Sequence, residues 1–164
     1  ELVGAGAMLR SGTGVHLPGH KPKLQPEDAG LWQRIEPLLE GSGLRSLSAK
    51  EIAAAIGLDP DKARSLLARI SRLGLIVRVS QTRFFLPQAL LRLAQIAQDL
   101  AQGSPSGWVS ASAFRDRSGI GRNLTIEVLE FFDRVKFTRR EGDARRLLRP
   151  AHEVVVDREP ASDI

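Results

Sequence analysis

The sequence predicts a mainly α-helical chain with small β-hairpins, arranged as tandem helix-turn-helix domains. Three observations support this fold class. Aromatic residues make up only 5% of the chain against 42% hydrophobic residues, so the cores must be built from aliphatic side chains. Apolar residues recur at helical spacing in two successive stretches, and each stretch ends in two short runs of strand-forming residues around a turn. The repeat of about 60 residues matches a small domain and not a solenoid unit.

Residues 24–88 are predicted to form the first complete domain. Its opening helix contains Pro37, which should kink it because the proline ring clashes with the carbonyl four residues earlier. Ser48 and Glu51 have the spacing of a capping box at the start of a short second helix. A glycine turn and a longer amphipathic helix follow, and 75–86 is expected to form a hairpin. Helix, turn, helix and hairpin in this order predict a winged helix.

Residues 89–150 repeat this order and are predicted to form a second winged helix. A long helix and a loop precede a short strand and a short helix, which either Ser110 or Ser112 caps. A longer helix is expected over 122–134, and the hairpin over 135–149 is the second wing.

The two ends fall outside these domains. In residues 1–23, two short extended runs flank a glycine-rich turn. An isolated hairpin is barely stable, so this segment is predicted to be the final hairpin of a preceding winged helix, followed by a linker. Residues 151–164 are acidic and are predicted to be a disordered tail.

The charge pattern favours a polyanionic partner. The chain carries a net charge of +5, and between residues 134 and 149 seven Lys and Arg residues stand against two Asp and Glu residues. This pattern suits nucleic acid about as well as it suits a solvated charged surface. The apolar runs are too short to span a membrane and no signal-peptide pattern is present, so we expect a cytoplasmic protein with no membrane contact.

The sequence has no recognisable catalytic or metal-binding pattern. It contains no cysteine, and His16 and His20 have no carboxylate or thiol cluster beside them, so a zinc site is not expected. No glycine-rich phosphate loop ends in Lys-Ser or Lys-Thr, and no serine lies in a nucleophile elbow. We therefore expect neither enzyme activity nor a cofactor in this part of the protein.

The second winged helix carries a more specific signal. The run 114–123 (FRDRSGIGRN), the run 129–134 (LEFFDR) and the run 137–140 (FTRR) resemble the last winged helix of the bacterial selenocysteine-specific elongation factors, the SelB family. The run 15–20 (VHLPGH) resembles the junction ahead of that family's third winged helix. The resemblance therefore extends over about residues 1–150.

The resemblance implies a function. Members of the family join a translational GTPase portion, which uses GTP and Mg, to four winged helices. The last one binds the selenocysteine insertion element, an mRNA hairpin beside an in-frame UGA codon, so that selenocysteyl-tRNA is delivered to the ribosome there. This chain would hold the end of the second winged helix, the third (24–88) and the fourth (89–150). It would act as a monomer without binding GTP itself.

Within the fourth domain, the RNA contacts are expected at the start of the second motif helix and on the wing. Free backbone N–H groups at a helix start favour phosphate, and guanidinium groups pair with phosphates or stack on unpaired bases. The residues predicted to bind RNA are Arg117, Gly121, Arg122, Asn123, Arg139, Arg140, Arg145 and Arg146. At Asn123, many members of the family have Lys or Arg.

Other conspicuous residues are expected to be structural. Trp108, Phe114, Phe131 and Phe132 follow core spacing, and Asp133 is expected to pair with Arg134. The third domain is expected to be a spacer or hinge. Two alternatives remain open: a tandem winged-helix DNA-binding regulator and a protein-interaction scaffold. Neither motif helix offers a row of Arg, Asn and Gln for reading a DNA major groove, which weighs against the first.

Overall fold

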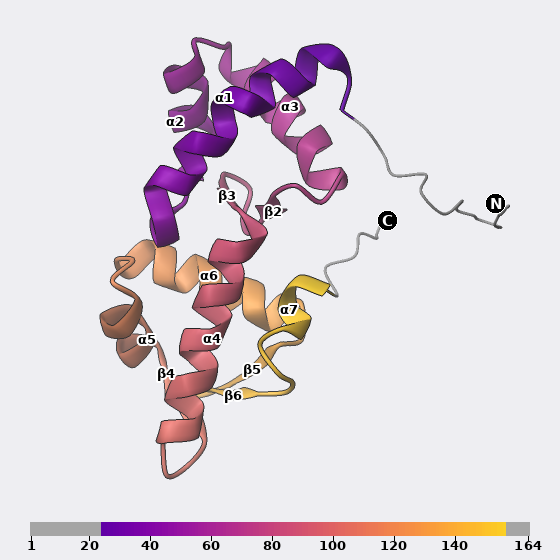
Figure 1. Cartoon of the computed structure of the whole chain (residues 1–164). Helices are drawn as coiled ribbons and strands as arrows, with labels where there is room; N and C mark the ends of the chain where they lie inside the picture. The colour runs from indigo at the N-terminus through magenta and orange to yellow at the C-terminus, as the bar shows by residue number, and fades with distance from the viewer. Residues whose placement is uncertain (1–23, 157–164) are drawn as a thin grey trace, which may run out of the picture.

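The computed structural model describes residues 24–156, so the hairpin predicted within residues 1–23 lies outside it. Two winged helices follow one another along the chain (Figure 1). The first, here called the N-domain, comprises residues 24–86, and the second, the C-domain, comprises residues 87–156. The long helix α4 (Pro87–Gly103) begins directly after the last strand of the N-domain. The fold class predicted from the sequence is confirmed.

The N-domain combines three helices with a small antiparallel sheet. Its elements are α1 (Pro26–Ser42), the 3-10 turn η1 (Gly43–Arg45), β1 (Leu47–Ser48), α2 (Ala49–Ile56), α3 (Pro60–Arg72), β2 (Val77–Arg78) and β3 (Arg83–Phe85). The strands are ordered β1-β3-β2, with Leu47 opposite Phe84 and Val77 opposite Phe85. The wing formed by β2 and β3 therefore gains a third strand from the segment that precedes α2.

Short-range signals set the ends of the N-domain helices. The Ser48 hydroxyl accepts a hydrogen bond from the Glu51 amide at 3.1 Å, and the Glu51 carboxylate accepts one from the Ser48 amide at 2.8 Å, which confirms the predicted capping box. Gly57 ends α2 at a φ of +70°, a conformation that favours glycine. Pro37 lies inside α1 without ending it.

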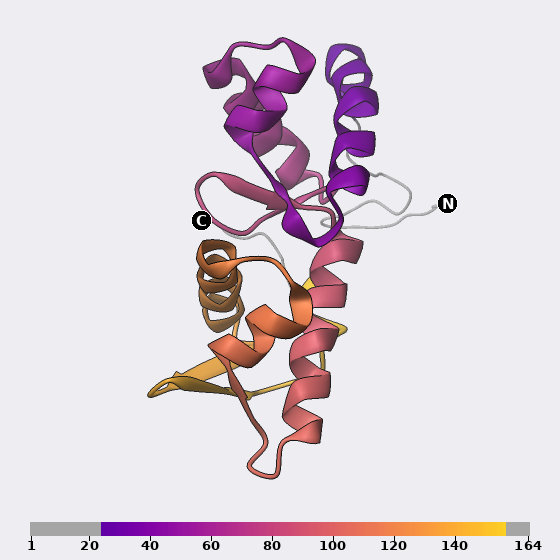
Figure 2. The same cartoon turned by 90° about the vertical axis from the view of Figure 1, so that its left-hand side faces the viewer.

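The C-domain repeats the arrangement. After α4 come β4 (Trp108–Ser110), α5 (Ala111–Ser118), α6 (Arg122–Arg134), β5 (Thr138–Glu141), β6 (Ala144–Leu147) and α7 (Glu153–Val156), and the strands are ordered β4-β6-β5. The cap of α5 is Ser110 and not Ser112, since the Ser110 hydroxyl accepts from the Ala113 amide at 3.1 Å. In Figure 2 the wing formed by β5 and β6 projects from below α6, away from α4.

The end of the described chain differs from its prediction. Residues 151–156, predicted to be disordered, form a turn and the short helix α7. Ala151 and Val154 are buried, and the Ala151 amide donates to the Gln98 side chain on α4 at 2.8 Å. Two apolar side chains against α4 outweigh the acidic composition that favoured disorder. The rest of the predicted tail, 157–164, lies outside the described residues.

The two cores meet at β3, where neighbouring side chains point in opposite directions. Phe84 packs into the N-domain core, whereas Phe85 packs into the C-domain core together with Val77 and Val79 of the same wing. Polar contacts reinforce this junction. Ser80 donates to Glu127 at 2.9 Å, and Arg134 donates to the Val79 carbonyl at 2.6 Å. The N-domain is thus packed against the C-domain through its own wing.

Aromatic side chains fill the centre of the C-domain. Phe114 and Phe137 each meet the Phe132 ring edge to face, at centroid distances of 6.1 and 4.9 Å. Phe114, Phe131 and Phe132 are buried, as predicted, whereas Trp108 is only half-buried. No helix among residues 24–156 is both long enough and apolar enough to span a membrane.

Candidate nucleic-acid interface

The start of α6 is open to an anion. Gly121 takes the N-cap position with a φ of +84°, and no side chain caps the helix there. The first N–H groups of a helix lack intrahelical partners, and the helix dipole favours negative charge at this end. Gly121, Arg122 and Asn123 are all exposed. The geometry therefore suits a phosphate group.

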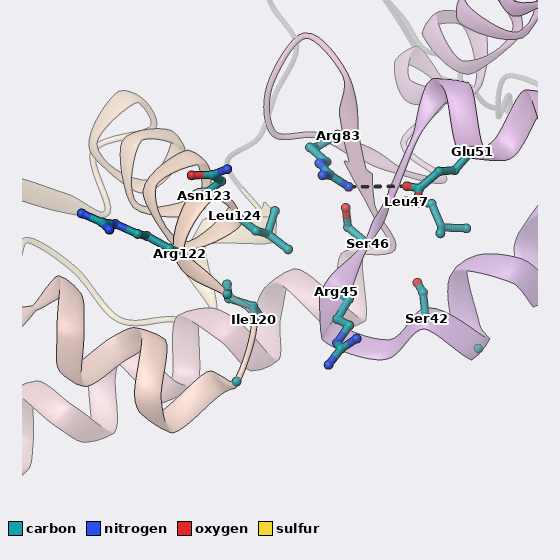
Figure 3. Close-up of a pocket in the computed structure, with 13 residues that line it drawn as sticks. Ser42, Arg45, Ser46, Leu47, Glu51, Arg83, Ile120, Arg122, Asn123 and Leu124 are labelled. Carbon is teal, nitrogen blue, oxygen red and sulfur yellow. Dashed lines mark ion pairs between the residues drawn. The ribbon is translucent and has the colours of Figure 1, made fainter.

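Two arginines add free positive charge to this end of α6. Arg117 lies exposed in the last turn of α5, and Arg122 extends away from the N-domain in Figure 3. Within residues 24–156, neither guanidinium has an ion pair or a hydrogen bond. Arg115, by contrast, pairs with the neighbouring Asp116 at 3.4 Å. Arg117 and Arg122 are therefore available for charge-assisted bonds to phosphate.

The wing presents its arginines on two different faces. Arg139 lies opposite Arg146 and Arg146 opposite Trp108, so these three side chains form one row across the sheet. The Arg146 guanidinium lies over the Trp108 ring, 4.9 Å from its centre, which is a cation–π contact. Arg139 keeps 59% of its side chain exposed while it pairs with Glu141. We call this row the outer wing face.

The opposite row contains Arg140, Arg145 and the buried Val109. Arg140, on the edge strand, is exposed and donates to the Gly142 carbonyl at 3.1 Å. Arg145, on the central strand, keeps only 7% of its side chain exposed and pairs with Asp133 of α6 at 3.1 Å. Its position on the inner face of the central strand leaves Arg145 without access to a ligand. Arg145, which the sequence predicted to bind RNA, therefore holds the wing in place and is not an RNA contact.

The predicted pair between Asp133 and Arg134 is wrong. Asp133 faces the wing, where it accepts from Arg145 and from the Thr138 hydroxyl at 2.6 Å. Arg134 faces the N-domain and donates to the Val79 carbonyl, with its guanidinium 5.5 Å from the centre of the Phe131 ring. Neighbouring residues on a helix point in directions about 100° apart, which follows from 3.6 residues per turn, so Asp133 and Arg134 lie on different faces of α6.

The sequence prediction missed a cleft at the domain junction. The turn before α6 faces Arg45, Ser46 and Arg83 of the N-domain across a space of about 890 Å³. No local motif marks these residues, because η1 and β3 are brought together with α6 only by the packing of the two domains. The part of the chain that the structure describes contains no group of three or more His, Cys, Asp or Glu that could hold a metal ion.

Comparison with known proteins places this geometry in a family. A family model described as "Elongation factor SelB, winged helix" matches residues 104–147. The name of that model designates a third winged helix, whereas the sequence resemblance implied that this domain is the fourth. The mRNA-binding domain of elongation factor SelB from E. coli, solved in complex with SECIS RNA, superimposes with a TM-score of 0.69 at 33% identity. The match covers 76% of this chain and 98% of that one. The chain belongs to the SelB family.

Full-length SelB relatives agree with this assignment. The selenocysteine-specific elongation factor of Escherichia coli (strain K12) is 36% identical over 84% of this chain, and that of Haemophilus influenzae is 28% identical over 87%. The chain spans only 21% and 23% of the length of these two SelB proteins. The matched region is the winged-helix part of SelB.

Proposed function

We propose that this region binds an mRNA hairpin of the selenocysteine insertion type through its C-domain. The observation that carries the proposal is the match to the E. coli SelB domain solved with SECIS RNA, which covers nearly all of that domain. The proposed contacts are Arg117, Gly121, Arg122 and Asn123 at the start of α6, and Arg139, Arg140 and Arg146 on the wing.

The shape of the site supports RNA over duplex DNA. Sequence-specific RNA recognition targets loops and bulges, whose bases stack on aromatic or guanidinium planes. The outer wing face offers such planes, since Arg146 already lies over the Trp108 ring and Arg139 lies beside it in the same row. At the start of α6, backbone N–H groups and two free arginines offer phosphate contacts. Phosphate contacts would position the hairpin while the wing contacts an unpaired base.

The full-length relatives extend the proposal to the whole protein. Their name is selenocysteine-specific elongation factor, and the chain corresponds to about a fifth of their length. We propose that this region tethers such a factor to its mRNA, while a GTPase portion with GTP and Mg delivers selenocysteyl-tRNA to the ribosome in the cytoplasm. The binding region itself would act as a monomer.

Binding assays on three probes test the proposal. Fluorescence anisotropy would compare the SECIS hairpin of the E. coli relative, the same hairpin with its bulged bases paired, and duplex DNA of equal length. We expect the bulged hairpin to bind most tightly, with an affinity that falls as salt rises. Equal affinity for duplex DNA would contradict the RNA assignment. No salt-sensitive binding to any probe would favour a protein-interaction scaffold.

A further inference from the structure

A cleft of about 890 Å³ separates the N-domain from the start of α6 (Figure 3). One water molecule accounts for about 30 Å³ of liquid, so the cleft has room for a nucleotide-sized group. Its N-domain wall comes from the end of α1, from η1, from the start of β1, from Glu51 of α2 and from β3. Its C-domain wall is the segment 119–124, which includes the helix start proposed above to bind phosphate. The cleft is thus continuous with the proposed RNA site.

The charge lining the cleft favours an anion. Arg45, Arg83 and the base of Arg122 line it against one acidic residue, Glu51, and the Arg122 side chain extends away from the N-domain. Arg83 is already shared between Glu51, at 3.5 Å, and Glu127, at 3.7 Å. Arg45 is exposed, and among the residues that the structure describes no acidic group or carbonyl pairs with its guanidinium. Arg45 therefore provides the uncompensated positive charge on the N-domain wall.

Ser46 is a second, independent sign of a ligand. Only 5% of this residue is exposed, and its hydroxyl has no hydrogen-bond partner within the described chain. Figure 3 shows the hydroxyl on the side of Ser46 that faces Arg83 and Leu124. Buried polar groups nearly always have a partner, so a buried hydroxyl that lines a cleft and has none indicates a ligand or a bound water there.

The backbone at Ser46 supports the same interpretation. Its φ is +58° and its ψ is 173°, a conformation that is costly for any residue except glycine. A serine in this conformation keeps a buried hydroxyl beside the cleft at the expense of stability. Strain of this kind is found preferentially at ligand-binding sites.

We propose that the cleft holds the backbone of the bound RNA, with Arg45 as the charged partner of one phosphate and Ser46 as a hydroxyl partner at a separate point of the same strand. The inference rests on the proposed function, because it takes the ligand to be the strand held at the start of α6. It assigns the N-domain a direct role in binding, beyond that of a spacer. Arg83 would contribute less, since Glu51 and Glu127 already neutralise its charge.

The cleft shares its wall with the proposed RNA-binding helix start, which favours the RNA over a separate anion as the ligand. Gly121, Arg122 and Asn123 belong both to the helix start proposed to bind the hairpin and to the wall of the cleft. A strand bound at that helix start therefore brings its neighbouring phosphates to the mouth of the cleft. A free phosphate ion would use the same chemistry, and a competition experiment separates the two sources.

The first experiment replaces Arg45 in the full chain and measures binding of the SECIS hairpin by fluorescence anisotropy at several salt concentrations. Arg45→Ala should weaken binding about tenfold and make the slope of log affinity against log salt less steep by about 0.7 to 0.9, the value expected when one phosphate is no longer neutralised. Arg34→Ala, which removes an exposed arginine of α1 outside the cleft, should leave both quantities unchanged.

Modified RNA identifies the phosphate itself. A set of hairpins would be made, each with one phosphate replaced by a neutral methylphosphonate. At one or two positions, the replacement should weaken binding to the wild-type chain but should not weaken binding to Arg45→Ala. Such a non-additive pair shows direct coupling between the residue and the phosphate. Inorganic phosphate, added at constant ionic strength, should not displace the hairpin selectively from the wild-type chain.

Ser46→Gly separates a binding role from a structural one. Glycine relieves the positive φ and removes the hydroxyl, so the melting temperature should rise while hairpin affinity falls about threefold. A higher melting temperature together with a higher hairpin affinity would overturn the role of Ser46. Wild-type affinity in Arg45→Ala, while Arg139→Ala with Arg140→Ala still weakens binding, would overturn the cleft proposal alone. Absence of any hairpin preference in the wild-type chain would instead overturn the proposed function.

Discussion

Arg145 of the wing donates through its Nε to both carboxylate oxygens of Asp133 on α6, at 3.2 and 3.1 Å. The Thr138 hydroxyl donates to the same carboxylate at 2.6 Å, so one acidic group connects both wing strands to the helix. Arg146, the next residue along the strand, lies on the opposite face against Trp108. Two adjacent arginines therefore have different roles, and the difference can be measured.

Arg145→Ala should destabilise the C-domain, because it leaves the Asp133 carboxylate partly buried without its charged partner. Breaking a buried ion pair in this way costs about 3 kcal/mol. Arg146→Ala, the matched control on the exposed face, should change the free energy of unfolding by less than about 1 kcal/mol while weakening hairpin binding. Urea unfolding followed by circular dichroism gives the first quantity, and anisotropy gives the second. Equal stability of the two variants would contradict the division between the faces.

The sequence predicted where the helices and strands lie better than which side of each element faces the core. Ser48 and Glu51 mark a helix start through hydrogen bonds between residues three positions apart, and such local signals are preserved in the fold. Arg145 and Arg146 are indistinguishable in the sequence, because only the register with Trp108 and Val109 decides which arginine points inward. The cleft at Arg45 depends on the packing of two domains, and no local pattern encodes it.

Replacing Arg139 and Arg140 together by Ala should weaken hairpin binding and flatten its salt dependence. If each contacts a phosphate, the slope of log affinity against log salt should fall by about 1.4 to 1.8. Both side chains are exposed, so the free energy of unfolding should hardly change. Unchanged affinity in the folded double variant would place the RNA elsewhere.

Glu141→Gln offers the complementary change on the wing. Glu141 pairs with Arg139 and so competes with any phosphate for its guanidinium. Neutralising Glu141 should strengthen hairpin binding at low salt, by about twofold to fivefold, because an exposed ion pair contributes up to about 1 kcal/mol. The gain should vanish when Arg139 is also replaced by Ala. A gain that persists in the double variant would mean that Glu141 repels the RNA directly.

Phe84→Ala and Phe85→Ala should destabilise different domains, although the two residues are neighbours. Phe84 is buried in the N-domain core and Phe85 in the C-domain core. Each replacement should cost about 3–5 kcal/mol. Hydrogen exchange should show loss of protection mainly in α2 and α3 for Phe84→Ala, and mainly in α4 and α6 for Phe85→Ala. The same exchange pattern in both variants would mean that the two cores unfold as one unit.

Asp28→Asn should destabilise the N-domain only where Asp28 is ionised. Hydrogen bonds from Arg69, at 2.8 and 3.0 Å, hold the pKa of Asp28 below its ordinary value of 3.8. A depressed carboxyl pKa adds stability above the unfolded-state value, and this stability is lost as pH falls through the folded-state value.

We therefore expect Asp28→Asn to lower the free energy of unfolding by about 1–2 kcal/mol at pH 7, a modest figure because water screens the half-exposed Arg69. The deficit should shrink as pH falls below about 4 and should disappear below the lowered folded-state pKa, where the wild-type carboxyl is neutral as well. Asp61→Asn is the matched control, since Asp61 forms an exposed pair with Arg64 and should change stability by less than about 0.5 kcal/mol. Urea unfolding at a series of pH values measures both. A deficit of equal size at pH 3 and pH 7 would show that Asp28 acts through packing, because the other titrating groups are the same in the wild-type and variant chains.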